Sequence, residues 1–252
     1  MQVLLFEPNK TIASAFIKRL EAAGAKCVSI DKDFFDADAV KAVASSITTA
    51  ALLISDDGAA EGYIKTLRAN GCKSPIISIL GQKDSSRARE LIDSGADDAL
   101  VVPINGEEVL ARAKAIIRRS YGHVSASVTI GDVKAYFDGR DPEVNGQRIR
   151  LSGREHAIFT HLALQPGRVI SKEQIYAAVY GLLDSQPYAK VIDVYICKIR
   201  KKLEESTGNK YIETVYGRGY KLTDPYKEKE ARKRRPEARP NGAHVEPLTS
   251  AA

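Results

Sequence analysis

KVIDVYICKIRKKL, the stretch at residues 190–203, decides how the carboxyl-terminal half of the chain folds. Its apolar residues Ile192, Ile196, Ile199 and Leu203 recur at steps of four, three and four positions. This spacing places them on one face of an α-helix, because a helical turn takes about 3.6 residues. The apolar stripe therefore predicts a helix that buries one side in a domain core.

The opposite side of the same helix is predicted to be cationic. It carries Lys190, Val194, Cys197, Lys198 and Lys201, with Arg200 and Lys202 at its edges. Such a face suits the major groove of DNA, where a helix fits between two rows of phosphates. An ordinary solvated helix surface is the alternative interpretation of this face taken alone.

A predicted β-hairpin follows this helix. The sequence YIETVYGRGYKL at residues 211–222 forms two short alternating runs around a Gly-Arg-Gly turn at 217–219. Alternation on both sides of a glycine-rich turn is typical of a hairpin. A basic helix followed by a hairpin with an arginine at its tip indicates a winged helix-turn-helix.

Two further helices and a small sheet are predicted upstream. Ser152 with Glu155, and Ser171 with Gln174, have the spacing of capping boxes, each of which opens a short amphipathic segment. Before them, residues 128–152 hold short strand-like runs separated by Gly, Asp and Asn turns. These runs predict a small antiparallel sheet in front of the three helices.

Taken in this order, the motifs resemble the DNA-binding half of OmpR/PhoB-type response regulators. The resemblance rests on LSGREHAIFTHLALQPGRVISKEQIYAAVYG at 151–181, VIDVYICKIRKKLE at 191–204 and YIETVYGRGYKL at 211–222. It implies that the basic helix reads the major groove and that the hairpin meets the minor groove. The DNA-binding residues implied in this way are Lys190, Val194, Tyr195, Cys197, Lys198, Arg200, Lys201, Tyr216 and Arg218.

Charge divides the chain into two unequal halves. Residues 1–122 contain 16 Lys and Arg against 16 Asp and Glu, whereas residues 123–252 contain 22 against 16. A basic domain joined to a neutral one is expected where one half binds phosphates and the other receives a protein or a signal. The predicted organisation is a receiver-like domain at 1–119, a linker at 120–127, a winged helix-turn-helix domain at 128–224 and a disordered basic tail at 225–252.

The cysteines and the hydropathy pattern narrow the class of protein. Cys27, Cys72 and Cys197 are odd in number and far apart, which argues against a disulfide framework or a zinc site. The sequence shows neither a run of about eighteen apolar residues nor a charged-then-apolar leader. We therefore expect a cytoplasmic protein in a reducing compartment, without a membrane partner and without a cofactor or metal.

The first half alternates strand-like and helical segments. The runs MQVLLF, AKCVSI, AALLIS, PIISIL and ALVV are each followed by a helical stretch, which makes five β/α repeats. This pattern predicts an α/β fold with a five-stranded parallel sheet covered on both faces. Residues 1–119 also resemble the receiver domain of response regulators, most clearly in LRANGCKSPIISIL at 67–80 and ELIDSGADDALVVP at 90–103.

The receiver resemblance implies a set of phosphorylation residues, several of which are replaced. Receivers place two acids after the first strand for Mg²⁺, an aspartate after the third to accept the phosphoryl group, a Thr or Ser after the fourth and a Lys after the fifth. Each of these groups binds the metal ion, accepts the phosphoryl group or balances its charge. The corresponding positions hold Glu7 and Pro8, then Ser55 with Asp56 one place on, then Leu80 or Gly81, and finally Val102.

A phosphate at this site would lack its cationic partner and its hydroxyl donor. We therefore predict a degenerate receiver that works without phosphorylation. The alternative is a conventional receiver in which Asp56 accepts phosphate after a loop shift, with Mg²⁺ held by Glu7 and Asp57. A solvated turn is a further explanation for the two neighbouring aspartates.

The family pairs its receivers through the fourth helix, fifth strand and fifth helix, using salt bridges between partners. The resemblance implies an interface made of Arg87, Arg89, Asp98, Glu108 and Arg112, with Ala88 at a position that is usually basic. The alternative is that these are surface charges paired within one molecule, worth about 0–1 kcal/mol each.

The sequence therefore predicts a sequence-specific, DNA-binding transcription regulator that is not an enzyme and acts as a homodimer on paired half-sites of double-stranded DNA. One alternative is a conventional two-component regulator phosphorylated at Asp56, for which Mg²⁺ would be required. Another is a flavodoxin-like enzyme or nucleotide binder, which lacks support because no glycine-rich phosphate loop follows the first strand. A protein that docks on the receiver is a further expected partner. The chain is also similar to orphan flagellar regulators of alphaproteobacteria, which favours a role in flagellar regulation.

Overall fold

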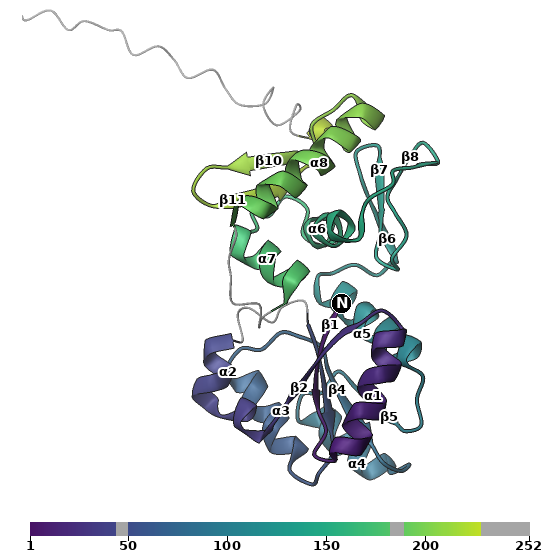
Figure 1. The fold of residues 1–252 in the computed structure, drawn as a ribbon, viewed down its shortest axis with the longest axis vertical. Helices are drawn as coiled ribbons and strands as arrows, with labels where there is room; N and C mark the ends of the chain where they lie inside the picture. Colours follow the sequence, from purple (N-terminus) through teal and green to yellow (C-terminus); the bar gives the residue numbers. More distant parts are fainter. Residues whose placement is uncertain (44–49, 182–188, 228–252) are drawn as a thin grey trace, which may run out of the picture.

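The computed structural model of the protein describes residues 1–43, 50–181 and 189–227. These residues form two parts that lie one above the other, an amino-terminal α/β part and a carboxyl-terminal part of helices and small sheets (Figure 1). No helix in the described ranges is both long enough and apolar enough to cross a membrane. Nearly all of the predicted tail lies outside these ranges.

The amino-terminal part is built on a five-stranded parallel sheet in the order β2-β1-β3-β4-β5. The strands are β1 (Gln2–Phe6), β2 (Lys26–Ile30), β3 (Ala51–Ser55), β4 (Ile76–Leu80) and β5 (Asp98–Val101). The connecting helices are α1 (Lys10–Ala22), η1 (Lys32–Phe35), α2 (Ala37–Val43), α3 (Ala60–Ala69), α4 (Ser85–Asp93) and α5 (Gly106–Ser120). The predicted α/β fold with five repeats is confirmed.

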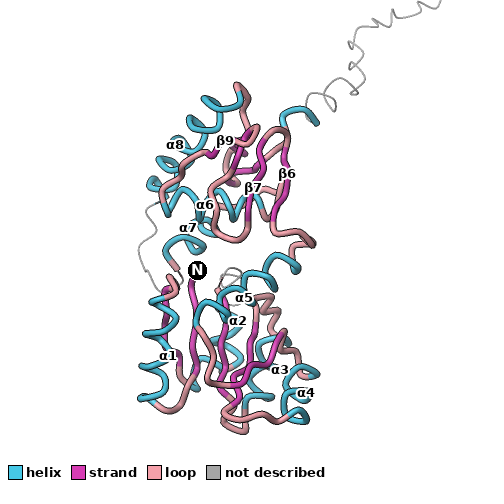
Figure 2. The backbone as a smooth tube through the Cα atoms, turned by 90° about the vertical axis from the view of Figure 1, so that its right-hand side faces the viewer, coloured by secondary structure: helices cyan, strands magenta, loops and turns pink. Residues whose placement is uncertain are grey.

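Helices cover both faces of this sheet and create two apolar layers. On one face α1 and α5 pack Leu20 and Val109 against the strands. On the other face α3 and α4 contribute Ile64 and Leu91. The middle strands β3 and β4 are buried along their whole length, as a parallel sheet covered on both sides requires. Strand β1 begins beside the second part, so the carboxyl ends of all five strands lie at the far end of the molecule (Figure 2).

The carboxyl-terminal part is a winged helix-turn-helix. It opens with a four-stranded antiparallel sheet of β6 (Ser127–Ile130), β7 (Val133–Tyr136), β8 (Glu143–Val144) and β9 (Gln147–Arg148). The helices α6 (Gly153–Ala163), α7 (Lys172–Tyr180) and α8 (Ala189–Thr207) follow. An antiparallel hairpin of β10 (Ile212–Val215) and β11 (Gly219–Leu222) completes it.

Both predicted capping boxes are present and explain where two of these helices begin. The Ser152 hydroxyl accepts the backbone N–H of Glu155, whose carboxylate accepts the N–H of Ser152 in return. Ser171 and Gln174 make the same reciprocal pair at the start of α7. Each box satisfies two of the backbone N–H groups that a helix start leaves without an intrahelical partner.

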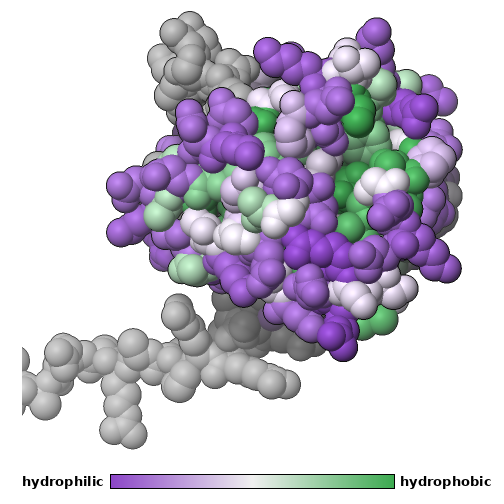
Figure 3. Space-filling view, turned by 90° about the horizontal axis from the view of Figure 1, so that it is seen from below, coloured by the Kyte–Doolittle hydropathy of each residue, from purple (hydrophilic) through white to green (hydrophobic). Residues whose placement is uncertain are grey.

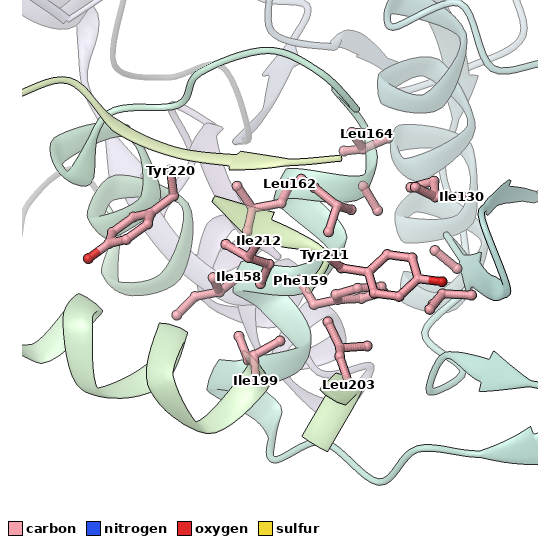
Figure 4. Close-up of a cluster of buried hydrophobic side chains, with 14 of the residues drawn as sticks. Ile130, Ile158, Phe159, Leu162, Leu164, Ile199, Leu203, Tyr211, Ile212 and Tyr220 are labelled. Carbon is pink, nitrogen blue, oxygen red and sulfur yellow. The ribbon is translucent and has the colours of Figure 1, made fainter. Parts of the chain in front are cut away.

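The apolar stripe of α8 lies in the core of this part. Ile192, Ile196 and Ile199 have no exposed surface, and Leu203 is 1% exposed. They belong to one buried cluster with side chains of α6 and the hairpin, including Phe159 and Tyr211 (Figure 4). Burying an aliphatic side chain of this size stabilises the fold by about 1.5–3 kcal/mol. The predicted stripe is confirmed, and it leaves the opposite face of α8 outside the core.

Candidate functional site

The outward face of α8 presents Val194, Cys197, Lys198 and Lys201, which are all exposed. We call these four residues the recognition face. Val194 keeps 54% of its surface exposed, whereas valine is among the residue types most often buried in folded proteins. Lys201 has a long contact of 3.8 Å with Glu205 and remains 78% exposed, so its ammonium is available to another partner. The face therefore combines two exposed cations with one exposed apolar side chain.

Asp193 fixes the rotation of α8 against its neighbours. Its carboxylate accepts hydrogen bonds from the Tyr220 hydroxyl of β11 at 2.6 Å and from Lys172 Nζ of α7 at 2.8 Å. Burial raises the pKa of Asp193, but Lys172 and Tyr220 lower it by more, so the net shift of the pKa is downward. One charged carboxylate thus joins α7, α8 and the hairpin.

The side chain of Lys202 does not join the exposed cationic face that the sequence predicts. The sequence put it at the edge of the cationic face, but its Nζ donates to Glu155 Oε2 at 2.7 Å and to the Arg150 carbonyl at 2.9 Å. Glu155 is almost fully buried. The side chain of Lys202 therefore joins α8 to the start of α6, because an unpaired carboxylate there would be costly.

Two of the implied DNA-binding residues of α8 use their polar groups within the chain. Arg200 donates to the Ile212 carbonyl at 2.9 Å and to Thr214 Oγ1 at 2.8 Å, so its guanidinium is turned toward the hairpin. The Tyr195 hydroxyl accepts a hydrogen bond of 3.0 Å from Arg154 Nη1. The side chain of a third predicted residue, Lys190, lies outside the described part of the structure.

The tip of the hairpin, residues 216–218, points into solvent. Tyr216 is 92% exposed and Arg218 is exposed beside it. The N–H of Arg218 donates to the Val215 carbonyl at 2.9 Å and closes a tight turn. Gly219 follows with φ +135°, where any Cβ would overlap the carbonyl oxygen of Ile170. A glycine is required there because the hairpin crosses this backbone at close range.

At the carboxyl end of β3 a guanidinium occupies the place where receiver chemistry is expected. Ser55 is buried as the last residue of the strand, and Asp56 follows it. Arg87 of α4 donates to the Asp56 carboxylate through Nε and Nη2, each at 2.8 Å. Two parallel bonds of this kind are among the strongest polar contacts in proteins. We call this contact the Arg87–Asp56 pair.

The Arg87–Asp56 pair is shielded from water and shifts the titration of both groups. The side chain of Arg87 is 20% exposed and that of Asp56 is 13% exposed. Hydrogen bonds from Arg87 hold the pKa of Asp56 below its ordinary value of 3.8, against the opposing effect of burial. The same bonds raise the pKa of Arg87. Both groups are therefore charged at neutral pH.

The acids around this pair do not fit a magnesium site. Glu7 accepts a backbone N–H two residues on at 2.9 Å, and Pro8 supplies no side-chain oxygen. Asp57 lies 3.3 Å from the ammonium of Lys32, and Asp56 is already held by its arginine. Residues 1–43, 50–181 and 189–227 contain no group of three or more side chains that could hold a metal ion. A hard cation would find too few free oxygens here.

The two remaining phosphorylation positions hold apolar side chains. Leu80 ends β4 and is buried, and Val102 follows β5, so neither a hydroxyl nor an ammonium is supplied from these positions.

The end of the molecule that carries the carboxyl ends of the strands is mostly hydrophilic, with separate hydrophobic areas (Figure 3).

Three of the predicted interface residues lie together on the surface of β5 and α5. Arg112 donates to Asp98 at 3.1 Å and to Glu108, one helical turn earlier, at 2.7 Å. Arg89 is exposed on α4. Arg87, expected beside it on the same surface, instead points to Asp56.

No pattern in the sequence predicts the Arg87–Asp56 pair. Its two residues are 31 positions apart, and no periodicity links them. Only the folded sheet brings the loop after β3 next to the first turn of α4. An arginine at the third residue of a predicted helix, opposite an acidic loop, was the one available hint.

Sequence comparison relates the chain to a family of regulatory proteins and to individual known proteins. Residues 146–222 match the family described as "Transcriptional regulatory protein, C terminal". Over 226 residues the chain is 36% identical to the cell cycle response regulator CtrA of Brucella ovis and of Brucella canis. The alignment covers 89% of this chain and 97% of each relative.

Solved structures include similar chains. The response regulator DrrB of Thermotoga maritima, an OmpR/PhoB homolog, shares 23% identity with a TM-score of 0.38, over 88% of this chain and 98% of that one. The DNA-binding domain of CpxR from E. coli shares 26% identity with a TM-score of 0.36, over 40% of this chain and 99% of that one.

Proposed function

Because this chain belongs to the OmpR/PhoB-type response regulators, which are transcription regulators and not enzymes, we propose that it binds specific DNA sequences through α8 and the hairpin and that its receiver works without phosphorylation. We further propose that residues 1–119 and 128–224 act as the two functional domains, joined by the linker 120–127. Control of flagellar genes is a narrower proposal, which a genome-wide map of bound sites tests.

The recognition face carries the proposal of DNA binding. Lys198 and Lys201 project from the side of α8 that the core leaves free, and lysine there suits the acceptor groups of guanine in the major groove. Val194 is placed to touch a thymine methyl group. Arg218, at the hairpin tip, would enter the minor groove or hold its phosphates, and a narrow A·T-rich groove favours it.

The residues that surround the recognition face take positioning roles in this proposal. Arg200 and Tyr195 hold the hairpin and α6 in place through their hydrogen bonds, so they set the angle at which α8 meets the groove. Cys197 is small and nearly neutral, and it adds no strong polar contact between the two lysines. Lys190 is expected to meet the DNA backbone.

The Arg87–Asp56 pair supports the proposal that the receiver needs no phosphate. A phosphoryl group on Asp56 would have to displace two charged hydrogen bonds of 2.8 Å. Val102 occupies the position from which receivers supply an ammonium, and the acids around Asp56 do not fit a magnesium site. The pair also ties α4 to the loop after β3, a link that phosphorylation would otherwise have to create.

Homodimerisation completes the proposal. We infer that two receivers meet through the surface that carries Asp98, Glu108 and Arg112, and that two DNA-binding domains then occupy half-sites about one helical turn apart. With no phosphate to shift the population, dimer content follows protein concentration, because an equilibrium moves only through differential binding.

The DNA-binding proposal is tested by replacing the lysines of the recognition face. Lys198→Ala and Lys201→Ala are expected to weaken binding to a selected site by about 1–3 kcal/mol each and to relax one position of the site. Lys18→Ala, an exposed lysine on α1, is the control and should leave affinity unchanged. Gel-shift titrations on the selected site and on single-base variants measure both effects. Unaltered affinity on every site would refute the assignment of this face.

The receiver proposal is tested separately with acetyl phosphate and Mg²⁺. We expect no phosphoryl incorporation and no change in DNA affinity or dimer content of the full chain. Asp56→Asn is the control, because an amide keeps the shape of the side chain and cannot be phosphorylated. A phosphate-dependent gain in affinity that Asp56→Asn abolishes would establish the conventional mechanism instead.

A further inference from the structure

A cavity of about 280 Å³ lies where the two parts of the molecule meet. The last turns of α5 form one wall, and α6 with the strand-end residue Phe137 forms the other. Figure 2 shows α5 leaving the sheet and ending against the second part. Ile117 of α5 belongs to the hydrophobic core of the DNA-binding part, so this contact is a packed one. The cavity thus joins the receiver to the DNA-binding domain.

Two cations without counter-ions face this cavity. Lys114 and Arg118 are one turn apart on α5, and both line it. In the described ranges no ion pair of either residue is found, and the cavity lining contains no Asp or Glu. Nε of Arg118 is fully shielded from solvent and has no hydrogen-bond acceptor. A buried donor of a charged group without an acceptor is costly, and two like charges at this spacing repel each other.

A second unsatisfied nitrogen lies on the opposite wall. His161 of α6 is 4% exposed, lines the cavity, and its Nδ1 has no hydrogen-bond partner. Burial lowers the pKa of His161 to about 4, so its ring is neutral at pH 7 and offers one donor and one acceptor nitrogen. His156 on the same helix differs, because its Nε2 contacts the Arg140 carbonyl at 2.8 Å and its Nδ1 contacts Thr160 Oγ1 at 3.4 Å.

The helix dipole does not account for this arrangement. Cations in the last turn of a helix are favourable, and Arg119 serves that purpose on the exposed side. Arg118 gains the same benefit, but the lining that it shares with Lys114 contains no acid, so a counter-anion for these two cations would have to come from outside the chain. The rest of the lining is largely apolar and includes Ile117, Phe137 and Leu164.

We propose that this cavity binds a small organic carboxylate, whose charged end meets Lys114 and Arg118 and whose apolar body lies against Ile117, Phe137 and Leu164. Its volume stands just under the range of about 300–1,000 Å³ typical of ligand sites, which favours a compact ligand. A carboxylate suits the planar fork of a guanidinium.

Such a ligand would touch both domains at once. Its binding free energy would therefore depend on how the receiver sits against the DNA-binding domain, which gives a receiver without a phosphate switch another input. This consequence rests on the proposed function, whereas the binding itself does not. The two are separable, because the binding is measured without DNA.

The test is calorimetric titration of the full chain with hexanoate, benzoate and 2-naphthoate, each compared with its uncharged amide. We expect saturable binding of at least one carboxylate with one site per chain, and an affinity for the matching amide that is lower by about tenfold or more. Arg118→Gln should lower carboxylate affinity by a similar factor. Arg119→Gln, the same change on the exposed neighbour, should leave it within about twofold.

A second variant keeps the test decisive if Arg118→Gln loses its fold. Lys114→Gln removes the other cation, which is also half-buried, and should weaken carboxylate binding as well, with thermal unfolding as the check on folding. Absence of saturable binding for all three carboxylates would overturn the proposal. Equal binding of acids and amides, or equal loss in Arg119→Gln and Arg118→Gln, would overturn it as well.

Discussion

At the scale of single residues, Arg87 and Asp56 carry a measurable share of receiver stability. Arg87→Ala removes both hydrogen bonds to Asp56, together with those to Glu90 and the Gly58 carbonyl, and leaves the Asp56 carboxylate, which is 13% exposed, without its partner. We expect a loss of about 1–3 kcal/mol in the free energy of unfolding, measured by urea denaturation at pH 7. Arg89→Ala, at an exposed position two residues along α4, is the matched control and should change stability by less than about 0.5 kcal/mol.

The pH dependence of that loss follows from the direction of the Asp56 shift. The folded-state pKa of Asp56 lies below its ordinary value of 3.8, so the stabilisation is fully present above that value. It disappears as the pH falls through the lower, folded-state pKa, because protonation removes the charge that Arg87 binds. The stability difference between wild type and Arg87→Ala should be constant at pH 5–7 and shrink in acid. A difference that persists unchanged at the lowest pH where the protein is folded would contradict the ion-pair explanation.

At the scale of elements, the hairpin depends on Arg200 for its position. Arg200→Ala removes the bonds to the Ile212 carbonyl and Thr214. We expect a loss of about 1–2 kcal/mol in unfolding free energy. We also expect a lower DNA affinity, with the largest loss on A·T-rich flanks, where we propose that Arg218 binds. Lys201→Ala is the contrasting variant, since it should weaken DNA binding without changing stability. If Arg200→Ala leaves stability intact and relaxes one base position, this arginine reads the major groove after all.

The sequence predicts the helices and strands better than it predicts the contacts between them. The stripe of Ile192 to Leu203, the two capping boxes and the hairpin were all predicted, because each is fixed by residues close together in the chain. The sequence did not predict the hydrogen-bond partners of the long side chains. Lys202 and Arg200 looked like members of a cationic face, yet each reaches a partner between twelve and 52 positions away. Such contacts depend on which elements pack together in the fold, and the spacing of nearby residues does not predict this packing.

At the scale of the whole molecule, we propose that copies associate through the surface of β5 and α5. Arg112→Glu leaves three carboxylates where a cation now joins two. We expect less dimer in sedimentation velocity and a larger loss of affinity on paired half-sites than on a single half-site. Arg119→Glu makes the same charge change elsewhere on α5 and should not distinguish the two kinds of site. Equal losses on single and paired sites with Arg112→Glu would mean that the receivers do not pair through this surface.

The Arg87–Asp56 pair also changes what a genetic experiment at position 56 would report. An Asp→Glu allele imitates a phosphorylated receiver only if the added methylene carries the carboxylate into open space. Here that space is filled by a guanidinium 2.8 Å away, so the longer side chain must displace Arg87 and, with it, the start of α4. A mutant phenotype of Asp56→Glu would then arise from steric crowding. For this chain the Asp56→Asn allele is the informative one, because it removes the charge and keeps the shape.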